Sequence, residues 1–294
     1  MFVSEYMRLI LIIFLIISLQ LHGQLNYLEG SWQGILTQTG QSPKDGKAIW
    51  FDFTVDPVSG DMKGESRVET PFTKYFAYKK VVGTVKSKRE ISFKDDFIGL
   101  DKNAGTDVWC LTKGDLVYTD STGYLKGKWI SSDCRQGGII SLYRSKYKLS
   151  KTDSMTLYHS WFNNMVNDLS RGWNAYYVRE AEMRDFQFVP VYFDHDKDIL
   201  KATFDDYLNK MANIVNSHSD LRIKIIGHTD SNGSDNYNVG LSERRAERVK
   251  SFLIAAGAPS DKIVIEYRGE KDPATTNNTS FGKQLNRRVD FEFI

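Results

Sequence analysis

The stretch that decides the fold reads Gly227-His228-Thr229-Asp230-Ser231-Asn232-Gly233-Ser234-Asp235-Asn236-Tyr237-Asn238-Val239-Gly240-Leu241-Ser242-Glu243-Arg244-Arg245-Ala246. An apolar run of strand length, residues 221–226, comes directly before it. After Asp235 the apolar positions recur at helical spacing until Gly257 provides a stop. The stretch is therefore predicted to be a polar loop between a buried strand and a long helix.

Strand-like and helix-like segments alternate on both sides of this loop. Three further strands are predicted at 189–193, 263–267 and 289–293. A helix before the loop is predicted from one apolar face, formed by Ile199, Leu200, Phe204, Leu208, Met211 and Val215. The order strand, helix, strand, helix, strand, strand predicts an α/β domain over residues 186–294.

Four motifs in this segment resemble those of the OmpA, Pal and MotB family of wall-binding domains. They are Tyr192-Phe193-Asp194-x-Asp196, the loop quoted above, Arg268-Gly269-Glu270 with Pro273, and Asn286-Arg287-Arg288-Val289. The resemblance implies an OmpA-like α/β sandwich that binds peptidoglycan through the diaminopimelate residue of the stem peptide. In that family an Asp after the second strand holds the ligand's ammonium group and an Arg on the next helix holds its carboxylate. The matching positions are Asp230 and Arg245.

The residue types agree with this chemistry. A free amino-acid terminus is a zwitterion, so its receptor needs an anionic acceptor and a planar cationic fork. We expect such a pair at the mouth of a site to contribute little to stability, within about 1 kcal/mol. The alternative for Asp230 and Arg245 is an ordinary ion pair or helix cap.

Five further residues complete the candidate site: Asp194, His195, Asn238, Arg287 and Arg288. Backbone N–H groups of the loop 194–196 are expected to take up the remaining lone pairs of the ligand's carboxylate. Asn238 is also interpreted as an internal brace of its loop. Of Arg287 and Arg288, one is expected to line the site and the other to be solvated.

Residues 24–148 have a different pattern, in which apolar and polar residues alternate with period two between frequent turns. Strands are predicted near 49–55, 81–85, 90–93, 108–111, 124–130 and 139–143. About eight strands in all would form a small barrel or sandwich. Paired glycines recur at Gly30 and Gly34, Gly60 and Gly64, and Gly123 and Gly127, which indicates hairpins of similar construction.

The opening Gly30-Ser31-Trp32 is faintly similar to the start of lipocalin-like and avidin-like barrels, which hold small ligands. The alternative is that the glycines serve strand bends and Trp32 plugs the core. An eight-stranded outer-membrane barrel would need apolar lipid-facing positions on each strand. The charged stretch at 86–90 argues against it.

Residues 149–185 are predicted to be a helical connecting segment. Leu157, Trp161, Met165 and Leu169 recur every four residues, and Gly172 provides a stop. Asp153 and Ser154 are the candidate N-caps. A helix with so wide an apolar face is expected to dock within the chain.

The N-terminus and the cysteines predict an exported protein. Arg8 precedes an apolar run at 9–21 that is too short to span a bilayer, so residues 1–23 are expected to be a cleaved signal peptide. This places the mature protein in the periplasm at the cell wall, with the outer membrane as a second candidate location. Cys110 and Cys134 are expected to form one disulfide there, with two buried thiols as the alternative.

Charge and motifs exclude several function classes. The 39 basic and 37 acidic residues leave a net charge of +2, which argues against a nucleic-acid partner. Ser145-x-x-Lys148 and Ser234-Asp235-Asn236 match two penicillin-binding signatures, but the third, Lys-Thr-Gly, is missing. Scattered histidines and a misplaced loop glycine give no zinc or calcium motif. We therefore predict no catalytic residue, metal or cofactor.

These observations together predict a non-enzymatic protein of the cell envelope. Its C-terminal domain would grip diaminopimelate-type peptidoglycan, while the β domain binds an outer-membrane or periplasmic protein partner. The alternative is a lipocalin-like carrier of a small ligand that is tethered at the wall.

Overall fold

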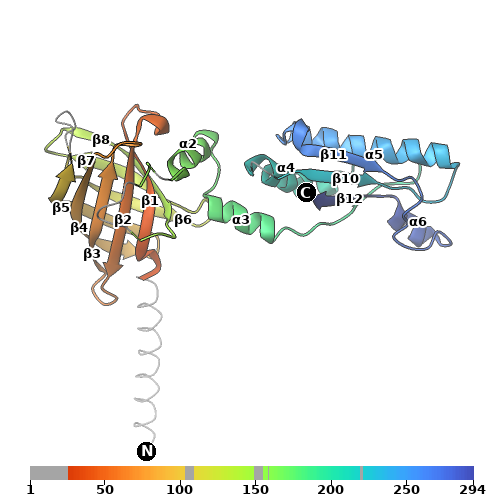
Figure 1. The fold of residues 1–294 in the computed structure, drawn as a ribbon. Coiled ribbons are helices and arrows are strands. Elements are labelled where there is room, and N and C mark those ends of the chain that lie inside the picture. The colour runs from red at the N-terminus through yellow and green to blue at the C-terminus, as the bar shows by residue number, and fades with distance from the viewer. Residues whose placement is uncertain (1–25, 103–108, 149–154, 158, 219–220) are drawn as a thin grey trace, which may run out of the picture. The chain divides into compact units, whose positions relative to one another are not determined.

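The computed structural model describes residues 26–102, 109–148, 155–157, 159–218 and 221–294. The chain divides into two compact units, residues 1–178 and 179–294, which are described separately (Figure 1). The predicted signal peptide and the candidate caps Asp153 and Ser154 lie outside the described residues. Among the helices that the structure describes, none is long and apolar enough to cross a membrane.

The first unit is built on a closed barrel of eight antiparallel strands, which confirms the all-β prediction and decides between barrel and sandwich (Figure 1). The strands are β1 Gly30–Gln38, β2 Lys47–Val55, β3 Asp61–Glu69, β4 Phe76–Ser87, β5 Glu90–Lys102, β6 Lys113–Thr119, β7 Tyr124–Ser131 and β8 Gln136–Arg144. Each strand pairs with the next, and β8 pairs with β1 to close the barrel. Two short 3-10 helices, η1 Asn26–Leu28 and η2 Pro43–Asp45, flank β1.

The predicted strand at 108–111 is wrong, because residues 109–112 form no strand and β6 begins only at Lys113. Local contacts hold this segment in an irregular path. Cys110 is joined to Cys134 by a disulfide with a Cα–Cα distance of 5.7 Å. Thr112 donates from its backbone N (2.9 Å) and its Oγ1 (2.8 Å) to the buried carboxylate of Asp95, which also pairs with Lys79 at 2.8 Å.

The barrel interior is a large apolar core that also encloses the buried Lys79–Asp95 ion pair. Alternate residues of each strand point inward, and the largest of them include Trp32, Phe51, Phe53, Phe93 and Trp129. Trp32 is fully buried, and its Nε1 donates to Leu28 O at 2.9 Å. The Arg144 guanidinium lies 4.3 Å from the centroid of the Trp32 ring. The interpretation of Trp32 as a core residue is therefore confirmed.

The repeated glycine pairs have a common structural cause. The first glycine of each pair has a positive φ, a conformation that L side chains rarely adopt: 114° at Gly30, 76° at Gly60 and 71° at Gly123. The second glycine lies against the backbone of a neighbouring strand. A Cβ added at Gly34, Gly64 or Gly127 would lie 1.9, 2.2 or 1.8 Å from a carbonyl oxygen. Each pair thus combines a turn at the start of a strand with a close approach of two strands.

The connecting segment docks on the outer face of the barrel, as expected for an apolar helix. The buried Glu69 carboxylate accepts hydrogen bonds from Met155 N at 2.9 Å and from Thr156 N at 3.0 Å. Helix α2, Trp161–Arg171, then packs Phe162 and Met165 against barrel residues.

One end of that helix was predicted correctly and the other was not. Gly172, with φ of 68°, ends α2 as predicted. Leu157 precedes the helix, so the predicted start was too early. A second helix, α3 Tyr176–Arg184, spans the boundary between the units.

The second unit contains a four-stranded sheet in the order β11-β10-β12-β9, with helices α4 and α5 packed on it. The strands are β9 Val191–Tyr192, β10 Ile223–Gly227, β11 Ile263–Tyr267 and β12 Arg288–Phe293. The longer helices are α4 Asp205–Ser217, preceded by η3 Ala202–Phe204, and α5 Asp235–Ala255, followed by η4 Ser260–Lys262. The predicted α/β class is confirmed.

The helices of this unit differ from the prediction at two places. Ile199 and Leu200 lie before the first helix rather than on its apolar face, and Ile199 is exposed. The short helix α6, Ser280–Asn286, was not predicted at all.

The glycine at the close approach gives the first testable prediction. Gly127→Ala places a Cβ against the backbone oxygen of Asp115, which a rotamer change cannot relieve, so we expect a loss of about 2–3 kcal/mol in the unfolding free energy of the barrel. The matched control is Gly99→Ala on β5, where the nearest atom would lie at an ordinary 3.6 Å and the effect should be small. Urea unfolding followed by circular dichroism measures both, and equal stability of the two variants would contradict the prediction.

Candidate functional site

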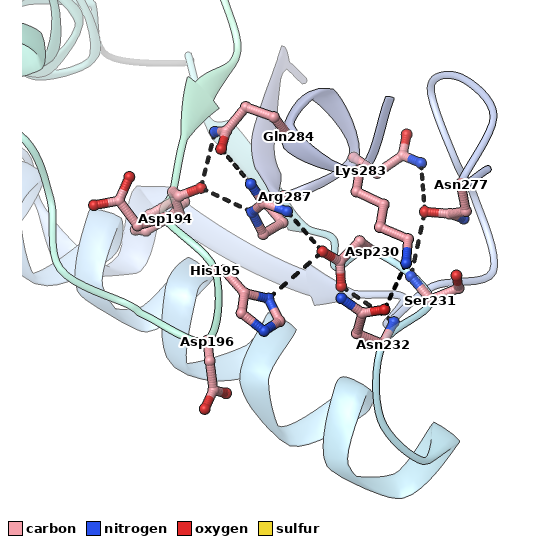
Figure 2. A network of polar contacts seen from close by, with 12 residues as sticks. Asp194, His195, Asp196, Asp230, Ser231, Asn232, Asn277, Lys283, Gln284 and Arg287 are labelled. Atoms are coloured by element: carbon pink, nitrogen blue, oxygen red, sulfur yellow. Dashed lines mark hydrogen bonds and ion pairs between the residues drawn. The ribbon is translucent and has the colours of Figure 1, made fainter. Parts of the chain in front are cut away.

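The sheet order brings three polar segments of the second unit to one edge. β12 is antiparallel to both β10 and β9, so β9 and β10 run in the same direction and their carboxyl ends lie at the same edge. The start of β12 lies there too. As a result, Asp230 after β10, the loop 194–196 after β9 and Arg287 just before β12 meet in space (Figure 2).

Asp230 is the centre of this cluster. Its buried carboxylate accepts a hydrogen bond from Arg287 Nη1 at 2.7 Å and another from Asn232 N at 3.2 Å. The exposed imidazole of His195 has its Nδ1 3.8 Å from the same carboxylate. The Asp230 carboxylate is thus a buried acceptor, and Arg287 is its cationic partner.

Arg287 is held by two other groups. Its Nε donates to Phe193 O at 3.3 Å, and its Nη2 donates to Gln284 Oε1. Gln284 Nε2 donates to the same carbonyl, Phe193 O, at 3.0 Å. The guanidinium therefore links β9, α6 and Asp230 (Figure 2).

Helix α6 and the loop before it supply residues that the sequence did not single out. Lys283 Nζ donates to Asn232 Oδ1 at 2.7 Å, and Asn277 Oδ1 accepts from Ser231 N at 3.2 Å. Figure 2 shows both contacts beside Asp230. The sequence contained one signal for this helix, the threonine at its N-cap. Thr279 Oγ1 accepts a hydrogen bond from Gly282 N at 3.0 Å, as N-cap threonines do. These contacts fix the loop that follows Asp230.

Arg245 is placed differently from the exposed fork expected at a site mouth. Its side chain is fully buried, and it donates to three backbone carbonyls: Lys197 O at 2.9 Å, His228 O at 2.9 Å and Asp194 O at 3.2 Å. The expected position at a site mouth is therefore wrong, and because Arg245 ties the loop 194–197 to the end of β10 we now expect it to contribute to stability.

The charge of Arg245 has no counter-ion within ion-pair distance. No carboxylate in the described part of the chain lies within 4.0 Å of its guanidinium nitrogens. Burial lowers its pKa to about 10, and the nearby charge of Asp230 is the largest effect in the opposite direction. A buried cation that is hydrogen-bonded only to neutral carbonyls favours an anion in its neighbourhood.

Residues 192–287 match the family model described as OmpA family. The second unit is an OmpA-like domain. Outer membrane protein A of Bordetella avium is 37% identical over 103 residues, which cover 35% of this chain and 53% of that protein. Outer membrane porin F of Pseudomonas fluorescens is 37% identical over 100 residues, which cover 34% of this chain and 31% of that protein. This chain therefore spans about half or less of the length of these curated relatives.

A solved structure with a similar segment is the peptidoglycan-associated lipoprotein from Burkholderia pseudomallei, with 28% identity and a TM-score of 0.35. The likeness covers 36% of this chain and 89% of that one.

The remaining candidates of the OmpA-like domain have distinct positions. Asn238 is buried and donates to the Glu270 carboxylate, which is the position of an internal brace. The Asp194 carboxylate is exposed and pairs with Lys201 Nζ at 2.7 Å. The prediction that one of the two adjacent arginines is solvated is wrong. Arg288 is buried because its guanidinium is held by neighbouring groups: its Nε donates to Asp290 Oδ2 at 2.8 Å and its Nη2 to Asp272 O at 3.2 Å.

His228 is a buried neutral group beside the site. Its Nε2 lies 3.4 Å from Asp290 Oδ2, while its Nδ1 has no hydrogen-bond partner in the described structure. Burial, followed by the charge of Arg288, lowers the pKa of His228 to about 4. In the described ranges no three His, Cys, Asp or Glu side chains are grouped to hold a metal ion.

The burial of Arg245 gives a matched pair of variants. Arg245→Ala removes the side-chain donor of His228 O and Lys197 O and leaves a hole in the core, so we expect a loss of about 3 kcal/mol or more in unfolding free energy. The neighbouring Arg244 is exposed, and Arg244→Ala should stay within about 0.5 kcal/mol of the parent. Chemical denaturation of both variants measures the difference. Similar small losses would show that Arg245 is not the brace described above.

The pKa of His228 predicts a pH dependence of stability. The folded-state pKa of about 4 is below the ordinary 6.5, so between these values the unfolded chain binds a proton that the folded chain does not. The unfolding free energy should therefore fall as pH is lowered from 6.5 towards 4. His228→Gln should make this slope shallower in urea titrations of the OmpA-like domain. Parallel slopes for parent and variant would contradict the prediction.

Proposed function

We propose that the OmpA-like domain binds the diaminopimelate residue of peptidoglycan stem peptides and so anchors the chain to the cell wall. The observation that carries this proposal is the buried guanidinium of Arg245, which has no carboxylate within 4.0 Å among the described residues and is affected by the nearby charge of Asp230. A zwitterionic ligand end would satisfy both charges at once. The match of residues 192–287 to the OmpA family supports the same function.

The ligand's ammonium group would bind Asp230. That carboxylate has two oxygens, and each keeps acceptor capacity beyond the bonds from Arg287 and Asn232. Arg287 would hold the Asp230 carboxylate in its orientation, while the exposed His195 borders the entrance.

The ligand's carboxylate would bind the loop 194–196. The backbone N–H groups of His195 and Asp196 donate to no acceptor in the described part of the chain, and Asp196 has a positive φ of 56°. Two carbonyls of this neighbourhood, Asp194 O and Lys197 O, face the Arg245 guanidinium. Because these carbonyls point toward the buried Arg245, the N–H groups of His195 and Asp196 remain available to donate hydrogen bonds to an anionic ligand.

The barrel would bind another component of the envelope, an outer-membrane or periplasmic protein, and the function of the whole chain would be non-enzymatic. We favour an outer-surface role for the barrel over a carrier role. Its interior is occupied by large buried side chains, among them Trp32, Phe51 and Trp129. Eight strands give an interior just wide enough for side chains to fill it or for one small ligand. We propose a location in the periplasm at the cell wall.

The ligand site can be tested with one isosteric change. Asp230→Asn keeps the size of the side chain but removes the charge that would hold the ammonium group, so we expect sacculus binding to weaken about thirtyfold or more. Co-sedimentation with diaminopimelate-containing sacculi measures it, for the chain from residue 24 and for the segment 186–294. Sacculi with lysine in place of diaminopimelate should bind poorly, because they lack the second zwitterionic end.

The control is Asp261→Asn, which removes the same charge at an exposed position of the same domain. It should bind as the parent does. Both variants should show circular dichroism spectra like the parent's. Equal binding by Asp230→Asn and Asp261→Asn would refute the site, and no binding of the parent to sacculi would refute the function.

A further inference from the structure

A groove of 840 Å³ lies on the outer face of the barrel, across β4, β5, β6 and β7. Three lysines line it, Lys94, Lys113 and Lys128, together with the apolar side chains of Val82 and Ile130. Asp115 is the acidic residue of its lining. The groove therefore joins an excess of positive charge to an apolar surface.

The strand register places like charges against each other. Lys94 on β5 is directly opposite Lys113 on β6. Lys113 is directly opposite Ile130 on β7, and Lys128 is two residues from Ile130 on the same face of that strand. A like-charge pair directly across two strands is unfavourable for folding. The pair concentrates positive charge at one place on the barrel surface.

The charges of these lysines are not neutralised within the described part of the chain. The ammonium groups of Lys94, Lys113 and Lys128 form no ion pair or hydrogen bond there. Asp115 is directly opposite Lys128, but its carboxylate is bonded to Lys86 Nζ at 2.7 Å and to Ser92. The groove is thus complementary to an anion.

Apolar side chains on the same face are exposed beside these lysines. Ile130 is 54% exposed, and Ile139, directly opposite Lys128, is 43% exposed. Lysine stems lie well along apolar surface while their ammonium groups reach polar surroundings. Basic residues interspersed with exposed isoleucines are the composition of surfaces that bind at the boundary between lipid headgroups and acyl chains.

The topology argues against an extended acidic peptide as the occupant. A peptide commonly binds a sheet by adding a strand at an unpaired edge. At the groove, the segments of β4, β5, β6 and β7 that line it are each paired with a neighbouring strand on both sides, so no unpaired edge is offered there. A ligand here must be recognised by side chains alone, which suits a compact phosphate group with an apolar tail.

We propose that this groove binds the phosphate of an anionic phospholipid at a membrane surface, with Lys94 and Lys113 flanking the phosphate and Ile130 and Ile139 entering the interfacial region. Lys128 adds a third positive charge at the border. The site lies wholly on the barrel, so it does not depend on peptidoglycan binding by the OmpA-like domain.

The test uses the chain from residue 24 and vesicles of phosphatidylcholine with and without phosphatidylglycerol. We expect the protein to float with the anionic vesicles and much less with the neutral ones, and the binding to weaken as salt is raised. Lys94→Gln/Lys113→Gln should lower the affinity for anionic vesicles about thirtyfold. Ile130→Ser, which leaves the charge unchanged, should also lower it.

The matched control is Lys44→Gln/Lys74→Gln, which removes two exposed lysines of the same unit outside the groove. Its affinity should stay within about twofold of the parent's, since the loss of distant charges is screened. Equal losses in the two double variants would mean bulk charge attraction and would overturn the site. Failure of the parent to bind anionic vesicles would overturn the proposal.

Two readouts separate this site from the fold and from the wall site. Lys94→Gln/Lys113→Gln should unfold at the same or higher urea concentration than the parent, because it relieves a like-charge pair. Its co-sedimentation with sacculi should be unchanged. A variant that lost both activities together with stability would show a structural role for the lysines and would overturn the proposal.

Discussion

The OmpA-like domain depends on how the buried guanidinium of Arg245 is satisfied. One side chain on α5 donates to carbonyls of Asp194 and Lys197 after β9 and of His228 after β10. Removing a guanidinium from water is costly, and neutral carbonyls recover only part of that cost. The fold accepts this cost at the point where two strand ends must be held together. The same contact therefore builds the site and leaves positive charge beneath it.

Much of this domain could be predicted from the sequence because its elements are local patterns. The run 221–226, the polar loop and the apolar spacing up to Gly257 correspond to β10 and α5. The motif with Asp230 and Arg245 pointed to the edge of the sheet at which β9 and β10 end. The burial of Arg245 was not readable, because it depends on carbonyls that lie 48 and 51 positions away in sequence. Helix α6 was missed because seven residues are too few to show a helical period.

In the barrel, too, the contacts that a local sequence pattern does not specify are those between residues far apart in the chain. Period-two alternation indicated strands, but alternation is identical in a sandwich and in a barrel. The difference is made by the pairing of β1 with β8, more than a hundred residues apart, for example Thr37 with Ile139. The glycine pairs were visible as an echo, and their cause became clear only with the neighbouring backbone in place. Gly34 faces Ser141 O and Gly127 faces Asp115 O. Glycine was needed because of a partner strand, which no local pattern specifies.

The two proposed anion sites differ in a way that has a physical consequence. The cation beneath the loop 194–196 is buried and held by three hydrogen bonds, so it is preorganised and little affected by salt. Lys94 and Lys113 are held by no such bonds, so their attraction for a phosphate is screened and costs side-chain entropy. A rigid site of the first kind suits a ligand of fixed geometry, such as an amino-acid end. A mobile site of the second kind suits a fluid lipid surface, where the position of each phosphate varies. The rigidity of each site thus matches the rigidity of the ligand that it is proposed to bind.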